Sequence, residues 1–374
     1  MRILAFLLGL ATVGCTSTKI YAPFGTDTPL PTTTLTAARI DTAIIGSMAR
    51  QIEAQDLDLH SLLILRDGKL AFEAYYHGHT RDTPHDIRSA TKSITSMLTG
   101  IAIDQGAFTS VDVPLMTYLG NRYPDIADKD DLTLRHLLTM SSGLDCHDRD
   151  RKTRGQEDRM YRSKDWVHYF LSLSRSYAPA DTTLYCTGGV VALGAAIAEA
   201  TEQDLAAFAD EALFGPLGIE NYQWARFDED RQVDTGGHLL ITPQGLAKIG
   251  QLVLQKGKWN GEQLISAEWI ETSTAQHVTY DGQRYGFLWW RYHIPYGKVT
   301  VEVINATGNG GQNIFIVPAY NLVVVSTAGY YNSDKAGIPH ELMFRGILPA
   351  VDELQTVLLQ QQRGQVSPGT NHEP

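Results

Sequence analysis

Ser89 and Lys92 are spaced three residues apart and are the residues of this chain best suited to covalent chemistry. A serine hydroxyl is a poor nucleophile until a neighbouring base takes its proton, and a lysine amine is such a base when burial and neighbouring charge depress its pKa towards neutrality. Residues three apart on a helix share a face, so the amine is expected beside the hydroxyl. The pair predicts acyl transfer through an ester on Ser89. By itself the spacing is weak, because an N-cap serine followed by a surface lysine shows it too.

The residues after this pair have the spacing of an amphipathic helix. Ile94, Met97, Leu98, Ile101 and Ala102 recur at helical intervals, and the glycine at position 106 is a plausible C-terminal stop. We expect the apolar face of this helix to be buried in the core. Its N-terminus then carries the nucleophile, where the helix dipole favours developing negative charge.

Strands are expected near both ends of the chain. An Asp-Gly turn at 67–68 separates the apolar runs 62–65 and 70–75, and Pro318 to Asn321 separates 313–317 from 322–327. The middle of the chain has apolar residues at helical intervals over 132–139, 189–214, 242–255 and 267–272. The expected fold class is α+β, with an antiparallel sheet built from both chain ends and a mostly helical middle region.

Short motifs in a fixed order carry a family resemblance. From about residue 62 to about residue 331 the sequence resembles the penicillin-recognising serine hydrolases, most closely the class C β-lactamase-like esterases and the 6-aminohexanoate-dimer hydrolases. The resemblance implies a β-lactamase/transpeptidase-like fold. The matching segments are Ser89-Ala90-Thr91-Lys92, 134–144, 157–161, 185–189, 236–237 leading into 240–243, 285–290 and 308–312.

The resemblance implies further roles. Tyr185 matches the tyrosine of the family's Tyr-x-Asn motif and would share proton transfer with Lys92. Thr187 replaces the asparagine of that motif, which removes an amide that would bind a substrate carbonyl. Ala306 replaces the lysine or histidine of the third motif, so a cation for a substrate carboxylate is missing. These departures favour neutral esters or amides, or an anchor elsewhere.

The backbone N–H groups of Ser89 and Asn309 are expected to hold the oxyanion. Neighbouring glycines would let the backbone approach the substrate closely, although a plain turn explains them equally well. The expected oxyanion and substrate-binding residues are Thr187, Gly308, Asn309, Gly310 and Gly311.

Three functions fit these residues. The first is a serine hydrolase of small esters or amides, which uses Ser89, Lys92 and Tyr185 and needs no cofactor. The second is a cell-wall DD-carboxypeptidase or a β-lactamase, which Thr187 and Ala306 disfavour. The third is a catalytically silent, lipid-anchored binding protein, which would be expected to have lost one of the three chemical residues. The chain has kept all three.

Metal and nucleic-acid binding are not expected. His77-Gly78-His79 resembles a metal-binding pair, but the companion ligands of a metallo-hydrolase do not follow it, so we interpret it as a surface hairpin edge. The formal net charge of -11 disfavours general binding of nucleic acid or anionic membranes. The chain has 374 residues, 43% hydrophobic and 20% charged, which is ordinary globular composition.

The first fifteen residues resemble a secretory leader that is too short to span a membrane. They end at Cys15 in a segment similar to a bacterial lipobox, although Thr12 stands where leucine is usual; an ordinary secretory signal is the alternative. We expect an exported protein that faces the periplasm, lipid-anchored at Cys15 or otherwise soluble. The expected organisation is a leader over 1–15, a tether over 16–35, the hydrolase domain over 36–360 and a disordered tail over 361–374.

Export also bears on the remaining cysteines. If lipid modifies Cys15, then Cys146 and Cys186 remain in an oxidising compartment. We predict a disulfide between them; two independent buried thiols are the alternative.

Overall fold

The computed structural model of the chain describes residues 19–21, 25–226 and 233–354. The expected leader with Cys15 and the expected tail from residue 361 lie outside these residues. Within the described ranges, no helix combines the length and the apolar character needed to cross a membrane.

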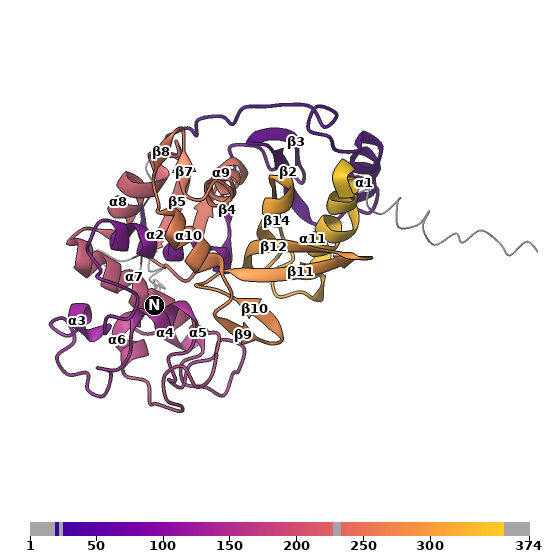
Figure 1. The fold of residues 1–374 in the computed structure, drawn as a ribbon. Coiled ribbons are helices and arrows are strands. Elements are labelled where there is room, and N and C mark those ends of the chain that lie inside the picture. The colour runs from indigo at the N-terminus through magenta and orange to yellow at the C-terminus, as the bar shows by residue number, and fades with distance from the viewer. Residues whose placement is uncertain (1–18, 22–24, 227–232, 355–374) are drawn as a thin grey trace, which may run out of the picture.

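A large antiparallel sheet takes its strands from both ends of the described chain, as the two hairpin patterns predict (Figure 1). The N-terminal hairpin lies at one edge, and its inner strand pairs with the strand that comes last in the sequence. The α+β prediction is therefore confirmed. From edge to edge the strands are β3 (Lys69–Tyr75), β2 (Leu59–Arg66), β14 (Leu322–Ala328), β13 (Gln312–Val317), β12 (Val299–Gly308), β11 (Trp290–Tyr296), β10 (Gln283–Tyr285) and β9 (Val278–Tyr280).

The central strands of this sheet are buried on both faces, and side chains alternate between the two faces along each strand. In β2, Leu63 and Leu65 belong to the larger apolar core, whereas Leu62 and Ile64 belong to a second core on the other face. This double burial explains why the central strands are uninterrupted apolar runs rather than alternating ones.

Different helices cover the two faces (Figure 1). The N-terminal helix α1 (Thr42–Ala54) and the C-terminal helical turns pack together on one face. Those turns are η4 (Asp334–Gly337), α11 (Ile338–Glu341), η5 (Leu342–Ile347) and η6 (Leu348–Ala350). On the other face, α9 (Pro243–Leu254) lies against β13 and β14.

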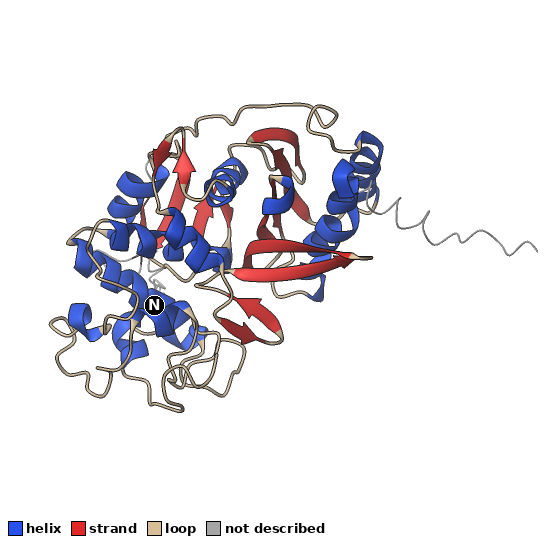
Figure 2. Cartoon of the chain, viewed as in Figure 1, coloured by secondary structure: helices blue, strands red, loops and turns tan. Residues whose placement is uncertain are grey.

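The middle of the chain forms a mostly helical region beside the sheet (Figure 2). The pattern over 189–214 predicted one helix, which is wrong: α7 ends where Glu202 adopts a positive φ of 55°, and Asp204 caps a new helix through the N–H groups of Ala206 and Ala207. The region contains α3 (Met116–Leu119), α4 (Leu134–Leu138), α5 (Glu157–Met160), α6 (Trp166–Leu171), α7 (Thr187–Thr201), α8 (Leu205–Ala209) and η2 (Asp210–Phe214).

A smaller antiparallel sheet has the order β1-β5-β6-β4. Its strands are β1 (Lys19–Tyr21), β5 (Tyr222–Arg226), β6 (Leu239–Ile241) and β4 (His85–Asp86). The remaining elements are β7 (Lys258–Trp259), β8 (Glu262–Gln263), α10 (Ala267–Thr274) and η3 (Pro318–Tyr320).

The described part of the segment expected to be a tether lies against the domain. Leu30 is buried in the larger core, and Asp27 accepts hydrogen bonds from the backbone N–H groups of Glu220 and Asn221. The burial of Leu30 and the hydrogen bonds of Asp27 hold this segment against the domain. This part of residues 16–35 therefore differs from the expected tether.

Candidate active site

Ser89 lies in a short 3-10 turn, η1 (Arg88–Ala90), which leads directly into α2 (Thr91–Asp104). Arg88 has a positive φ of 50°, which turns the chain sharply between β4 and the helix. Every residue of α2 from Thr91 to Ala102 is buried, so the helix is enclosed on all sides rather than amphipathic as expected.

Two buried polar side chains of α2 bond to carbonyls of other segments. The Ser93 hydroxyl donates to the Leu288 carbonyl at 2.6 Å, and the Thr95 hydroxyl donates to the Thr235 carbonyl at 2.9 Å. Because these bonds compensate for burial, the polar side of the helix is also held against its surroundings. The nucleophile therefore stands on a rigid support.

Lys92 is brought to Ser89 as the three-residue spacing predicts. Its Nζ donates to Ser89 Oγ at 3.1 Å and to the carbonyl of Gly236 at 2.6 Å, and the lysine is only 1% exposed. Ser89 is half-buried and borders an open cavity. The amine thus lies behind the hydroxyl, away from solvent.

The charge of Lys92 differs from the expectation. Burial alone lowers the pKa of Lys92, but Tyr185, Asp148, Glu157 and Asp234 outweigh it, so this pKa is raised above its ordinary value. A depressed pKa for Lys92 is therefore wrong. Negative groups that are distant in sequence surround the amine, and spacing alone cannot reveal them. Lys92 is an ammonium group that donates to Ser89.

Tyr185 lines the same cavity, immediately before α7. Lys92 Nζ lies 5.1 Å from the centre of its ring, at a distance typical of a cation–π contact. The predicted disulfide between Cys146 and Cys186 is present, with Cα atoms 5.5 Å apart, beside the tyrosine in sequence. It fixes the loop before Tyr185 to the segment that carries Asp148, whose N–H donates to the Tyr185 carbonyl at 2.9 Å.

Thr187 lies behind the cavity rather than in it. It is fully buried, and its hydroxyl donates to Asp148 Oδ2 at 2.7 Å, while its N–H also donates to that carboxylate. A second carboxylate, Glu157 Oε2, lies 3.3 Å from the hydroxyl. The expectation that Thr187 contacts substrate is thus wrong, because the half-buried carboxylate of Asp148 occupies its only side-chain donor.

The glycine-rich segment after β12 divides into two parts. Gly308 and Asn309 line the cavity, whereas Gly310 and Gly311, with φ of 96° and 98°, form the turn to β13 and do not line it. A Cβ atom on Gly308 would lie 2.0 Å from the Ile87 carbonyl oxygen. Glycine at 308 therefore allows this strand to approach the segment before Ser89, whereas the expectation concerned close approach to the substrate.

The cavity has a volume of about 810 Å³ and both signs of charge in its walls. Ala306 is fully buried and does not line it, whereas Thr307 does. Basic and acidic side chains that border the cavity are Arg88, Arg149, Arg151, Asp148, Glu157 and Asp158. Tyr161, Tyr185 and Trp290 provide aromatic walls.

Sequence reasoning missed the polar support around Gly236. Asp234 is fully buried, accepts the N–H of Gly236 at 3.0 Å and lies 2.6 Å from Nδ1 of His238. That hydrogen bond raises the pKa of His238. His238 Nε2 in turn lies 2.9 Å from Nη1 of Arg88. In the sequence, the Gly236-Gly237 motif marks this segment as part of the site. Which carboxylate holds the backbone of the motif depends on the fold.

A serine that accepts from a buried lysine, in a fold of helices and an antiparallel sheet, is the arrangement expected of a serine hydrolase. Residues 49–338 match the family model Beta-lactamase, so the chain belongs to the β-lactamase family. Membership of this family supports serine hydrolase activity, and it confirms the resemblance that the motifs indicated.

Individual relatives agree with this class. Over 300 residues the chain is 25% identical to a 6-aminohexanoate-dimer hydrolase of Paenarthrobacter ureafaciens, an alignment that covers 73% of each chain. A Bacillus anthracis protein provisionally named 6-aminohexanoate-dimer hydrolase has a similar fold, with a TM-score of 0.68, 17% identity and coverage of 93% of this chain and 91% of that one. A penicillin-binding protein from Bacillus halodurans gives a TM-score of 0.62 at 17% identity, covering 79% and 100%.

Proposed function

We propose that this chain cleaves small esters or amides through an acyl-enzyme on Ser89. The contact of 3.1 Å between Lys92 Nζ and Ser89 Oγ, beside a cavity that Tyr185 also lines, carries the proposal. A nucleophile that borders open space, with its partner amine enclosed behind it, suits attack on a bound carbonyl.

The proposed proton path follows from the charge of Lys92. Because the ammonium cannot accept a proton, Tyr185 in its phenolate form takes the Ser89 proton as Oγ attacks the carbonyl. Lys92 keeps its proton and stabilises the negative charge that moves between the two oxygens. Tyr185 then gives the proton to the leaving group. In the second step Tyr185 takes a proton from water, which attacks the acyl-enzyme, and returns that proton to Ser89 Oγ as the acid is released. The N–H groups of Ser89 and Asn309 hold the oxyanion.

The walls of the cavity suggest which substrates fit. Cations at Arg88, Arg149 and Arg151 can bind a carboxylate, and acids at Glu157 and Asp158 can bind an ammonium group. These cations lie elsewhere than Ala306, where the family's usual cation is missing. The proposed substrate class therefore includes short linear amides with charged ends, which agrees with the name of the curated relative.

The alternative is a cell-wall DD-carboxypeptidase or β-lactamase. The fold similarity to a penicillin-binding protein is compatible with it. Burial of Thr187 against Asp148 disfavours it, since the usual amide for the substrate carbonyl has no replacement at this position.

An activity screen with covalent labelling tests the proposal. We expect a fluorophosphonate to label wild type at Ser89 and wild type to hydrolyse p-nitrophenyl esters or short oligoamides, but not nitrocefin or D-alanyl peptides. Ser89→Ala should lose labelling and turnover. Tyr185→Phe should lower kcat by about 10²–10⁴-fold with little change in KM.

Other results would contradict the proposal in distinct ways. Turnover of nitrocefin or D-alanyl peptides alone would favour the cell-wall alternative. Absence of labelling in folded wild type would favour a silent binding protein.

We also propose that the chain is exported and anchored by lipid on Cys15. Mass spectrometry of the N-terminal peptide from the native membrane fraction should find a diacylglyceryl group on Cys15. An unmodified N-terminus in soluble protein would contradict the anchor.

A further inference from the structure

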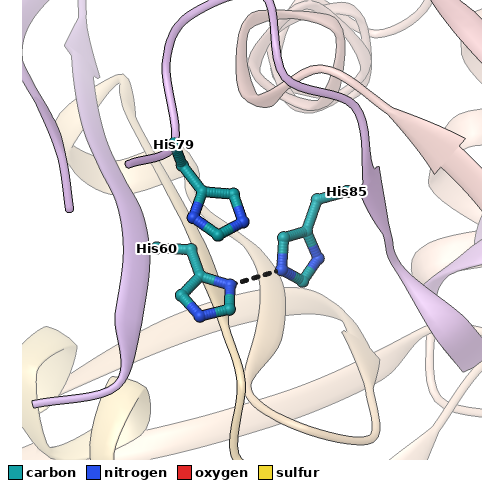
Figure 3. A group of neighbouring side chains, drawn as sticks. All are labelled: His60, His79 and His85. Carbon is teal, nitrogen blue, oxygen red and sulfur yellow. Dashed lines mark hydrogen bonds between the residues drawn. The ribbon is translucent and has the colours of Figure 1, made fainter. Parts of the chain in front are cut away.

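Three histidines from separate segments meet outside the active-site cavity (Figure 3). His60 lies in β2, His79 in the loop after β3, and His85 in β4. One nitrogen from each ring lies within 4.8 Å of the other two. The rings of His60 and His79 stack with centroids 4.0 Å apart, and the centroids of His60 and His85 are 5.0 Å apart. The expected surface edge at 77–79 is thus only half right: His77 is exposed, but His79 joins this cluster.

Each ring has an outer partner that fixes its hydrogen. Carbonyl and ionised carboxylate oxygens only accept hydrogen bonds, so the nitrogen facing each of them carries the proton. The three remaining nitrogens, Nδ1 of His60 and Nε2 of His79 and His85, are therefore lone-pair donors in the neutral rings. The outer contacts are His60 Nε2 to Asp58 Oδ1 at 3.0 Å, His79 Nδ1 to the Tyr76 carbonyl at 3.2 Å, and His85 Nδ1 to the Asp86 carbonyl at 3.2 Å.

Two of these lone pairs face each other. His60 Nδ1 and His85 Nε2 are 2.7 Å apart, joined by the dashed line in Figure 3. With both outer nitrogens already protonated, this contact needs a further positive charge between the rings. His85 is 5% exposed, so water has little access to this nitrogen. A bound cation satisfies both nitrogens at once.

We propose that His60, His79 and His85 form a zinc-binding site. Imidazole nitrogens suit zinc and similar transition metals, whereas magnesium and calcium prefer oxygen ligands. Zinc sites are tetrahedral with Zn–N distances of about 2.0–2.1 Å. Carboxylates or carbonyls that accept from the outer ring nitrogens usually orient the histidines, as Asp58 and the carbonyls of Tyr76 and Asp86 do here. Nitrogens on one such ion lie roughly 3.3 Å apart, so the His60–His85 contact opens by roughly 0.6 Å. Water completes the coordination.

The ion would join β2, the loop after β3 and β4 in one place. β4 continues through Ile87 and Arg88 to Ser89. The His85 ring also stacks with Tyr331 at 6.3 Å, and the guanidinium of Arg88 lies 5.1 Å from the Tyr331 ring centre. Zinc at this position braces the strand that leads to the nucleophile, and it takes no part in hydrolysis.

Metal binding by the untagged full chain tests this inference directly. After treatment with zinc and dialysis, wild type should retain stoichiometric zinc by mass spectrometry, and Co²⁺ should give the intense visible absorption of a tetrahedral site. His79→Gln should weaken zinc binding by more than about 100-fold, because it removes a ligand. Asp58→Ala, which removes the carboxylate that accepts from His60 Nε2, should weaken it by about 10–100-fold.

His168→Gln is the matched control, because His168 Nε2 also lies 2.8 Å from an aspartate, Asp125, at an exposed site. It should bind zinc like wild type. Zinc should raise the Tm of wild type and of this control but not that of His79→Gln. Wild type that retains no zinc, or equal zinc binding by wild type and His79→Gln, would overturn the proposal. The Co²⁺ spectrum of wild type keeps it testable should His79→Gln misfold.

Discussion

Thr187 shows how one residue changes meaning between sequence and structure. At the position of a substrate-binding asparagine, its hydroxyl and N–H are both directed to Asp148. The pKa of Asp148 is raised to about 7, mainly by burial. The charge of Lys92 lowers this pKa, and the charge of Glu157 raises it. The hydrogen bonds from Thr187 also lower it. Thr187 therefore stabilises the ionised form of Asp148 beside the Lys92 ammonium.

We expect Thr187→Val to lower the free energy of unfolding by about 1–3 kcal/mol near pH 8, since a buried carboxylate loses a donor. Thr187→Ser, which keeps the hydroxyl, should stay near wild type. Because the folded pKa of Asp148 is above the unfolded value, its contribution to stability is full below about pH 4 and is lost as pH rises through about 7.

In Thr187→Val this loss should extend to higher pH, because the folded pKa rises further. Urea unfolding on both sides of pH 7 measures it. Equal stability of the valine and serine variants would show that the hydroxyl is not bound to Asp148.

At the scale of elements, the C-terminal turns that cover the sheet carry a half-buried histidine, His340. In α11 the His340 ring lies edge-on to Phe315, with centroids 5.1 Å apart, and to Tyr292 at 5.7 Å. Burial lowers the pKa of His340 to about 4. Packing between the turns and the sheet therefore requires the neutral ring.

The pH dependence of unfolding should reveal this histidine. The folded pKa of His340 is below the unfolded value, so its contribution is full above about pH 6.5 and is lost as pH falls to about 4, by up to about 3 kcal/mol. His340→Leu, which cannot be protonated, should flatten the stability profile in this window. His168→Gln, at an exposed ion pair, should keep the wild-type slope. A slope unchanged in His340→Leu would assign the acid sensitivity to other groups.

At the scale of the whole molecule, one buried cation ties the two ends of the domain to the sheet. Arg66 ends β2, and its side chain is 1% exposed. Its Nη1 donates to the carbonyls of Ala38 and Arg39, each at 2.9 Å, and its Nη2 lies 2.6 Å from Glu353 Oε2. Segments before α1 and after η6 thus meet at a strand of the central sheet.

We expect Arg66→Met to lower the free energy of unfolding by about 2–4 kcal/mol, because two carbonyls lose their donor and Glu353 loses its partner. The matched control is Arg135→Met, which breaks an ion pair to Asp112 at an exposed surface and should cost no more than about 1 kcal/mol. Denaturant unfolding compares the two. A similar loss of unfolding free energy in both variants would mean that the buried contacts of Arg66 stabilise the protein no more than an exposed ion pair does.

Elements that depend on a local pattern could be predicted from the sequence. The Asp-Gly turn and apolar runs predicted the hairpin of β2 and β3, and the three-residue spacing placed Lys92 beside Ser89. The parity of Cys146 and Cys186 predicted their disulfide. Each follows from a short-range rule or a count, which tertiary contacts did not override.

The charges and partners of these residues follow from tertiary contacts. The pKa of Lys92 depends on acids that lie far away in the sequence, and the role of Thr187 depends on Asp148 in another loop. The meeting of His60 with His79 and His85 depends on two strands and one loop that the fold brings together. Electrostatic interactions act through space, so a linear pattern specifies the reactive pair but not the groups that set its protonation.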